Sequence, residues 1–365
     1  FFQAEDGIRD YYASRGSEMC IRDRFLTALR RVGAKVDVVI PHRIQDGYGL
    51  SLHLLQQAKE DGVDTILTCD NGIAAIDEIA WAKAQKMTVL VTDHHAVPFE
   101  EHEGRRTEKK SLADAVVNPH QQDCRYPYKE LCGAGVAWNV IRVLYENYDM
   151  DKREAEDLLD FVAMATVCDV MSLTGENRIL VKEGLKRIRH TKNIGLQALM
   201  QACNVQPENI SAYHFGYVLG PCVNATGRLD TARHALRLFE TGQETEAEEI
   251  ARDLVDLNQE RKELTLQGVE MAKKLCEEGG YENDPILVLF LPDVHESIAG
   301  LIAGRIREMY NRPVFVLTRG EEGVKGSGRS TENYSMYENM CGCAELFTKF
   351  GGHPMAAGLS LPEEN

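Results

Sequence analysis

Hydrophobic and polar positions alternate with two different periods along the first part of this chain. Short apolar runs of strand length are separated by stretches in which apolar residues recur at helical spacing. Because strands separated by single helices form parallel sheets with right-handed crossovers, we expect an α/β fold with a parallel sheet. The predicted strands cover residues 35–40, 65–69, 88–92 and 116–117, and the predicted helices cover residues 25–32, 50–61 and 74–86.

The pattern becomes helical after residue 135 and returns to α/β near the end of the chain. Residues 155–167 are apolar on most faces and predict a buried helix, which follows another helix at 136–145. Residues 244–278 are rich in Glu, Ala, Leu, Lys and Arg and predict a long helix joining two lobes. The second, smaller α/β unit is predicted from a strand, a helix and a strand, followed by two glycine-rich loops, at residues 286–291, 297–310, 314–317, 326–330 and 351–358.

Residues 1–24 (FFQAEDGIRDYYASRGSEMCIRDR) show neither period over a useful window. They resemble the translated read-through of a sequencing adapter. We therefore expect this segment to be non-native and the fold to begin near Phe25. The last residues, 359–365, contain no closing element, so we expect the chain to be cut short at both ends.

Composition narrows the class of protein. The 365 residues are 44% hydrophobic and 27% charged, which predicts a globular protein with two domains. The net charge of −16 argues against nonspecific coating of nucleic acid but leaves room for a local basic groove. No apolar run approaches the roughly 18 residues that cross a bilayer, so no membrane partner is expected. Ten cysteines without a CxxC pair or a secretory signal favour a cytoplasmic protein with reduced thiols.

Candidate chemistry appears where two predicted strands end. The strand at 88–92 runs into Asp93, His94 and His95, and the strand at 65–69 runs into Asp70. Open α/β sheets bind ligands beyond the carboxyl ends of their strands. The two strand ends therefore predict one metal site.

The residue types suggest which metal and which roles. Carboxylates and imidazoles without a thiolate suit manganese or magnesium. Asp70 is placed to bridge two ions, with His94 and Asp169 as further ligands, although Asp169 could equally cap the next helix. His95 is expected to face the substrate, and Asp93 is expected to orient a histidine.

Three polar, glycine-containing loops offer sites for a phosphate. Small residues let backbone N–H groups approach an anion, and arginine can add a bidentate grip. The candidates are Ser327 with Arg329, Gly352 with His353, and Arg228 in the segment NATGR.

A fourth loop, at residues 41–49, contains Arg43 and Tyr48. A base could stack on Tyr48 while a phosphate pairs with Arg43, and a rigid turn explains the loop equally well.

Several motifs occur together in the order known for one protein family. They are IPHRIQDGYGLS, LTCDNG, VTDHH, CGAG, ATVCDV, NATGRLD, GSGRS and FGGHPMAAG. From residue 25 onward the chain resembles the DHH phosphoesterase superfamily, and within it the bacterial exonucleases specific for single-stranded DNA. The resemblance implies a DHH domain at 25–235, a connecting helix at 236–280 and a truncated DHH-associated domain at 281–365.

The resemblance also implies roles for the candidate residues. Asp70, His94 and Asp169 match ligands of a two-metal site for Mn²⁺ or Mg²⁺, and His95 matches a residue that contacts the scissile phosphate. Arg228, Ser327, Arg329 and His353 match the pocket for a terminal 5′-phosphate, with Gly352 beside them as a further substrate-binding residue. Arg43 and Tyr48 match positions that contact the strand.

The implied activity is stepwise 5′-to-3′ release of 5′-mononucleotides from 5′-phosphorylated single-stranded DNA, in DNA repair and recombination. A single-strand-binding protein and a helicase are candidate partners. The family's first motif, Asp-x-Asp-x-Asp-Gly, should precede Phe25, where residues 1–24 stand instead. We therefore predict that this chain binds metal poorly and is inactive, and that the absence of an OB-type domain weakens its grip on long strands.

Two other functions remain open at this point. One is a superfamily member that degrades short oligoribonucleotides or cyclic dinucleotides, which the HRIQDGYG loop and the long connecting helix disfavour. The other is a non-catalytic scaffold that kept the fold without its metals. Intact Asp70, His94, His95 and Asp169 disfavour the scaffold.

Overall fold

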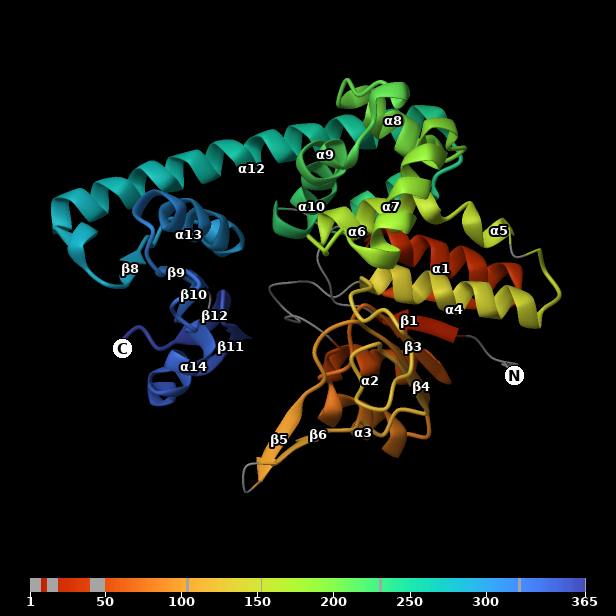
Figure 1. Ribbon diagram of the computed structural model, residues 1–365, viewed down its shortest axis with the longest axis horizontal. Helices are drawn as coiled ribbons and strands as arrows, with labels where there is room; N and C mark the ends of the chain where they lie inside the picture. The colour runs from red at the N-terminus through yellow and green to blue at the C-terminus, as the bar shows by residue number, and fades with distance from the viewer. Residues whose placement is uncertain are drawn as a thin grey trace. The chain divides into compact units, whose positions relative to one another are not determined.

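The strands predicted in the first part of the chain form one parallel sheet with the order β2-β1-β3-β4-β7 (Figure 1). The computed structural model describes residues 8–11, 19–39, 50–102, 105–151, 153–229, 232–320 and 323–364. The predicted α/β class is confirmed. The sheet strands are β1 (Ile8–Tyr11), β2 (Val36–Val39), β3 (Thr65–Cys69), β4 (Thr88–Thr92) and β7 (Ala115–Val117).

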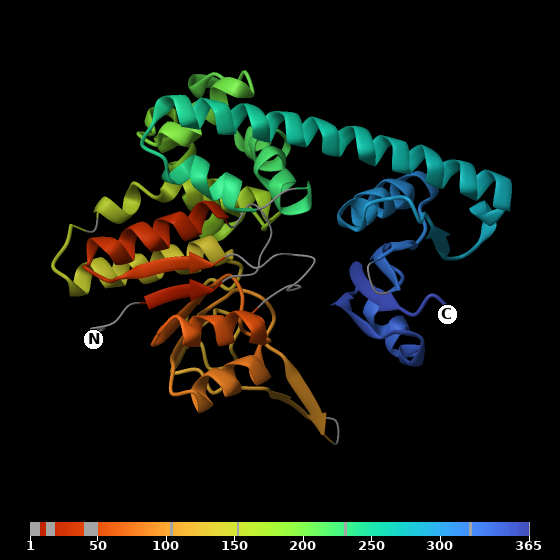
Figure 2. The same cartoon turned by 180° about the vertical axis from the view of Figure 1, so that it is seen from behind.

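Helices cover both faces of this sheet (Figure 2). All five residues of β3 are buried, as expected for a parallel strand with both faces covered. The helices α2 (Leu52–Glu60) and α3 (Ile76–Ala84) lie on one face, and α1 (Met19–Arg31) and α4 (Gly133–Asn147) lie on the other. Because helices cover both faces of the sheet, a ligand approaches it at the ends of the strands.

The expectation that the fold begins near Phe25 is wrong. Strand β1 pairs in parallel with both β2 and β3, and helix α1 starts at Met19. Part of residues 1–24 therefore belongs to the folded domain. The foreign origin of this segment stays a prediction.

A two-stranded hairpin interrupts the α/β alternation after β4. Its strands β5 (Phe99–His102) and β6 (Arg105–Glu108) pair antiparallel with each other. The guanidinium of Arg106 lies 4.4 Å from the centre of the Phe99 ring. The sequence pattern did not predict this hairpin, because its charged residues hide the strand period.

The middle of the chain is helical, as predicted, with more and shorter helices. The predicted helix at 155–167 is two helices, and the second of these is buried on most faces. Most helices of this region pack around a core that also contains the start of the long connecting helix. In order they are α5 (Arg153–Glu156), α6 (Leu159–Cys168), α7 (Gly175–Arg187), η2 (Ile188–His190), α8 (Ile194–Ala202), η3 (Pro207–Asn209), α9 (Ala212–His214), the π-helix η4 (Phe215–Leu219), α10 (Gly220–Leu229) and α11 (Ala232–Glu240).

The chain divides into two compact units, residues 1–256 and 257–365, and the boundary falls within the long helix α12 (Glu244–Gly279). The second unit has a sheet with the order β11-β12-β10-β9-β8, in which β8 and β9 are parallel and the other pairs are antiparallel. Its elements are η5 (Tyr281–Asn283), β8 (Leu287–Phe290), α13 (Glu296–Tyr310), β9 (Val314–Arg319), β10 (Val324–Arg329), α14 (Met336–Cys341), η6 (Ala344–Leu346), β11 (Lys349–His353) and β12 (Ala356–Leu361).

The two segments predicted as glycine-rich loops are strands, so that prediction is wrong. Gly326 and Gly328 lie in β10, facing the interior of the second unit. A Cβ at Gly326 would stand 2.5 Å from Leu317, and a Cβ at Gly328 would stand 2.6 Å from the sulfur of Met336. These glycines are required by close side-chain packing.

Among the described residues, no helix has both the length and the apolar character that crossing a bilayer demands.

Candidate metal centre

The ends of β3 and β4 place Asp70 and His94 at the same edge of the sheet. Cys69 is the register partner of Thr92, so the residues that follow the two strands emerge side by side. The backbone N–H of Asp70 donates to the carbonyl of Thr92 at 2.8 Å. Asp70 itself has φ of 63°, a left-handed conformation that Asp tolerates better than most residues. The strand therefore turns sharply at the residue that carries the carboxylate.

A third element completes the cluster. The His94 Nε2 atom lies 2.9 Å from Asp70 Oδ1 and 3.4 Å from Asp169 Oδ2. Asp169 follows α6 directly, and the next long helix is preceded by Thr174, so Asp169 does not cap that helix. The structure thus brings together the three residues predicted as metal ligands.

Asp93 is placed to hold the strand end and to orient His95. Its Oδ1 accepts hydrogen bonds from the backbone N–H groups of His94 and His95 and lies 2.7 Å from His95 Nδ1. Its Oδ2 accepts the N–H of Ile73 at 2.9 Å. With both oxygens engaged and 1% exposure, Asp93 acts through its neighbours, which fits the orienting role predicted for it.

His95 differs from the other members of the cluster in its exposure. Its side chain is 50% exposed, whereas the side chains of Asp70 and His94 are 1% and 9% exposed. Potential ligand atoms of Asp70, His94 and His95 all lie within 4.8 Å of one another. His95 therefore stands at the solvent side of the cluster, where it can reach either a cation or a substrate.

The electrostatics of the cluster favour a cation. Burial alone would lower the pKa of His94, but Asp70, Asp169 and Asp93 outweigh it and raise the pKa to about 9. The hydrogen bond with Asp93 is the main cause that raises the pKa of His95. The two buried carboxylates therefore stabilise a positive charge at this position, which the protonated ring of His94 supplies when no cation is bound. The oxygen and nitrogen donors present here fit Mn²⁺ or Mg²⁺.

Gly133, at the start of α4, gives Asp70 its space. A Cβ at this position would lie 2.1 Å from Asp70 Oδ1, a distance that no real side chain allows. The N-terminus of α4 also points its positive dipole toward the carboxylates. The sequence pattern CGAG was interpreted only as part of the family motif. A glycine at the start of a helix also indicates that another group packs closely against the backbone there.

Cys132 caps α4 beside this glycine. Its sulfur accepts the N–H of Gly135 and lies 3.1 Å from the Thr166 hydroxyl. Burial is the main cause that raises the pKa of the Cys132 thiol to about 12, so the group is neutral. It therefore adds no thiolate to the donor set.

The predicted phosphate-binding residues of the second unit share one sheet. Ser327 and Arg329 lie two residues apart on β10, so they point to the same face. Arg329 and His353 are both register partners of Ala356 on β12. The Arg329 guanidinium lies against α13, where a Cβ at Gly300 would stand 2.9 Å from Nη2. The register thus brings these positions together across three strands.

Other predicted residues give less structural information. Arg43 and Tyr48 lie outside the described residues. Arg228 belongs to the last turn of α10, so the segment predicted as a polar loop is a helix, and its side chain is not described. Gly352 lies in β11 with φ of 154°, and a Cβ there would stand 2.4 Å from the carbonyl oxygen of Ala356.

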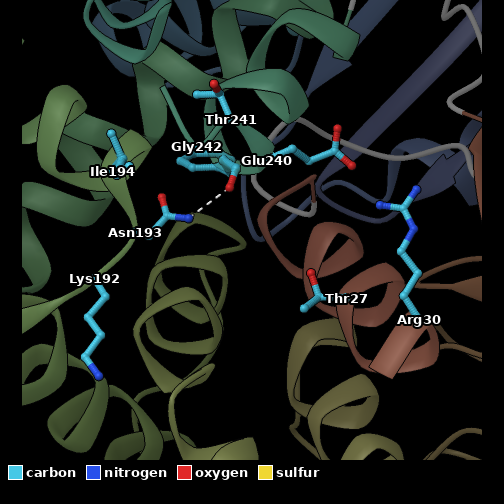
Figure 3. Close-up of a pocket in the computed structure, with 9 residues that line it drawn as sticks. Thr27, Arg30, Lys192, Asn193, Ile194, Glu240, Thr241 and Gly242 are labelled. Carbon is cyan, nitrogen blue, oxygen red and sulfur yellow. Dashed lines mark hydrogen bonds between the residues drawn. The ribbon is translucent and has the colours of Figure 1, made fainter. Parts of the chain in front are cut away.

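A separate hollow of about 320 Å³ lies between helices of the first unit (Figure 3). The amide of Asn193 spans part of it by donating to the carbonyl of Phe239 at 2.9 Å. The Lys192 side chain extends away from the other lining residues. None of the predicted site residues that the structure describes lines this hollow, which leaves the strand ends as the candidate centre.

Comparison with known proteins identifies the same family that the sequence motifs resemble. The DHH family, N-terminal domain, matches residues 16–166, and the DHHA1 domain matches residues 283–365. The single-stranded-DNA-specific exonuclease RecJ of Haemophilus influenzae is 37% identical over 356 residues, which cover 93% of this chain and 60% of that protein. This chain therefore spans about 60% of the length of that relative.

Two solved structures that resemble this chain belong to the same family. The crystal structure of exonuclease RecJ bound to manganese has a TM-score of 0.82 and 31% identity, covering 98% of this chain and 86% of that chain. The crystal structure of RecJ from Thermus thermophilus in complex with Mn²⁺ has a TM-score of 0.81 and 30% identity, covering 98% of this chain and 50% of that chain.

Proposed function

Because this chain belongs to the DHH family and, within it, to the RecJ exonucleases, we propose that it is the core of a metal-dependent exonuclease that degrades single-stranded DNA from the 5′ end. The observation that carries the proposal is the meeting of Asp70, His94 and Asp169 at the edge of the sheet. The RecJ proteins named above act on single-stranded DNA, and two solved relatives hold manganese. Short-substrate phosphodiesterases and scaffolds have no comparable support in this chain.

Asp70, His94 and Asp169 would hold Mn²⁺ or Mg²⁺. When bound, such a cation supplies positive charge against a phosphate oxygen and acidifies a water. The half-exposed imidazole of His95, fixed by Asp93, would contact the scissile phosphate. The buried carboxylates would remain charged to balance the cation.

The second unit would recognise the end of the strand. Arg329 and Ser327 on β10, with Gly352 and His353 on β11, would bind a terminal 5′-phosphate. Arginine suits this task because its planar fork grips phosphate through two N–H groups. Anchoring of the 5′ end would make the enzyme an exonuclease. By the family resemblance, Arg43 and Tyr48 would contact the strand, and Arg228 would contact the terminal 5′-phosphate.

The first motif of the family has no counterpart after β1. Residues 12–18 (YASRGSE) contain one carboxylate, at Glu18, where the family places several aspartates. We propose that the chain in this form is weakly active or inactive for that reason. We also propose roles in DNA repair and recombination, a cytoplasmic location, and partnership with a single-strand-binding protein and a helicase.

Digestion of a 5′-phosphorylated DNA strand tests this function. We expect a protein in which residues 12–18, directly after β1, are replaced by a segment with the sequence Asp-x-Asp-x-Asp-Gly to release 5′-mononucleotides in Mn²⁺. Asp70→Ala in that background should abolish release, while the unaltered chain should release little. Equal rates on a dinucleotide and on a long strand would favour the short-substrate alternative, and no release by the restored protein would refute the nuclease.

A further inference from the structure

Two tyrosines on the first unit stack on each other in solvent. Tyr213 and Tyr217 are 63% and 71% exposed, although large aromatic side chains usually bury most of their surface. Their ring centres lie 5.1 Å apart and their planes differ by 24°. The pair therefore presents an open, flat aromatic surface, here called the tyrosine platform, that the folded unit itself leaves uncovered.

The platform is built on a rigid element. Tyr213 lies in α9 and Tyr217 in the π-helix η4, and the two residues are one helical turn apart. Phe215 and Leu219, which alternate with them, are fully buried in the core of the unit. The edge of the His214 ring also packs on Tyr213, with ring centres 5.8 Å apart. Single π-helical turns of this kind occur frequently at functional sites.

The same turn packs against the end of the helix that delivers Asp169. The Cys168 thiol donates to the carbonyl of Phe215 at 3.3 Å, and a Cβ on Gly216 would stand 3.4 Å from Val167. Val167 and Cys168 are the two residues before Asp169, the proposed metal ligand. The residue after it, Val170, is 88% exposed and has φ of 58°, which is strained for a β-branched side chain. Val170 thus places an exposed apolar side chain directly after the proposed metal ligand.

We infer that the tyrosine platform stacks a nucleobase of the single-stranded DNA substrate, an inference that rests on the proposed function. Every base has a flat face, so stacking on tyrosine grips a strand without selecting its sequence. The exposed faces of the rings suit single bases, whereas a protein partner requires a much larger surface. The turn that carries the two tyrosines packs against Val167 and Cys168, the residues that precede Asp169, so the platform belongs to the same unit as the proposed metal centre.

Equilibrium binding tests the inference without cleavage. The probe is a 5′-phosphorylated oligothymidylate with a fluorophore at its 3′ end, and binding is measured by anisotropy in EDTA. The combined variant Tyr213→Ala/Tyr217→Ala should bind at least about tenfold more weakly, since each stacked base contributes about 1–3 kcal/mol. Tyr213→Phe/Tyr217→Phe should bind like the unaltered chain, because the ring faces remain. Tyr148→Ala, at a tyrosine that is 40% exposed elsewhere in the unit, is the matched control.

A scan with abasic sites separates stacking from misfolding. Removing the base at the stacked position should weaken binding of the unaltered chain but have no further effect on the double alanine variant. The dependence of affinity on salt should be the same for both proteins, because no phosphate contact is lost.

Three outcomes would overturn the inference. In the first, the double alanine variant binds as tightly as the unaltered chain. In the second, abasic sites weaken both proteins equally. In the third, the variant changes only self-association in sedimentation, so that the rings serve a second copy of the chain. Failure of the unaltered chain to bind any strand would instead remove the proposed function and, with it, the platform.

Discussion

At the scale of single residues, the charge state of His94 determines how the centre binds a cation. Its Nε2 lies between Asp70 and Asp169, and these carboxylates raise its pKa to about 9. At neutral pH the imidazole is therefore protonated and occupies the position of a cation. Because a metal binds only the neutral ring, binding must release that proton.

We predict that His94 titrates near pH 9 in the metal-free protein and that its pKa falls toward the ordinary value in Asp70→Asn. NMR of the imidazole carbon signals measures both values. Mn²⁺ affinity should rise about tenfold per pH unit below the pKa of His94, because one proton competes with the metal. Proton release, measured by calorimetry in buffers of different ionisation enthalpy, should be lost in His94→Gln.

The raised pKa of His94 also makes the stability of the metal-free protein depend on pH. A histidine whose pKa is raised by folding contributes stability that is complete below its unfolded pKa, near 6.5. This contribution disappears as the pH rises through about 9. The metal-free protein should therefore melt at a lower temperature at pH 9.5 than at pH 7, by a larger margin than His94→Gln does. Equal pH dependence in both proteins would contradict the ion pair.

Individual site residues were predictable where local sequence carries the signal. Asp70, Asp93, His94 and His95 follow apolar strands directly, and strand ends are where such sheets bind ligands. Asp169 was ambiguous, because a carboxylate after a buried helix can be a ligand or a cap. The structure separates the two roles, because Thr174 precedes the next helix and Asp169 Oδ2 lies 3.4 Å from His94 Nε2.

At the scale of elements, short buried strands were predicted well and glycine-rich strands were not. Strands β3 and β4 have the predicted bounds, since their apolar runs are continuous and end at polar residues. Strand β10 (VKGSGR) was taken for a loop because glycine usually breaks strands. Its glycines are required because Leu317 and Met336 pack closely against them from other elements. The hydrophobic pattern of the strand itself does not indicate those contacts.

The packing of α4 on the end of β3 leads to a second prediction. Gly133→Ala should destabilise the first unit and weaken Mn²⁺ binding by more than about tenfold, because its Cβ would overlap the Asp70 carboxylate. Thermal melting and metal titration measure the two effects. Gly242→Ala is the matched control, since a Cβ there meets no atom within 4 Å. Normal metal binding by Gly133→Ala would show that Asp70 has another position available.

At the scale of the whole molecule, each unit has its own hydrophobic core. The first unit contains Leu199, which is fully buried in α8, and the second contains Leu289, which is fully buried in β8. The two-lobed organisation and the long helix α12 were predictable from composition and period. The participation of residues 8–11 in the sheet was not, because their pairing with β2 and β3 is supplied by partners distant in sequence.

Separate cores predict separate unfolding. In Leu289→Ala, a cavity should cost the second unit about 2–5 kcal/mol and lower only one of two calorimetric transitions. In Leu199→Ala, the other transition should fall by a similar amount, and the combined variant should show both shifts together because the sites are independent. Leu266→Ala is the control: this side chain is 65% exposed, so neither transition should move.

One result would contradict this picture of the molecule. If Leu289→Ala lowered both transitions equally, α12 would transmit unfolding from one core to the other. The division at residue 256 would then describe the geometry of the chain but not its cooperativity. If only one transition moves, residues 257–365 should also fold when expressed alone, because the apolar residues Val269, Ala272 and Cys276 of α12 that complete their core lie within this range.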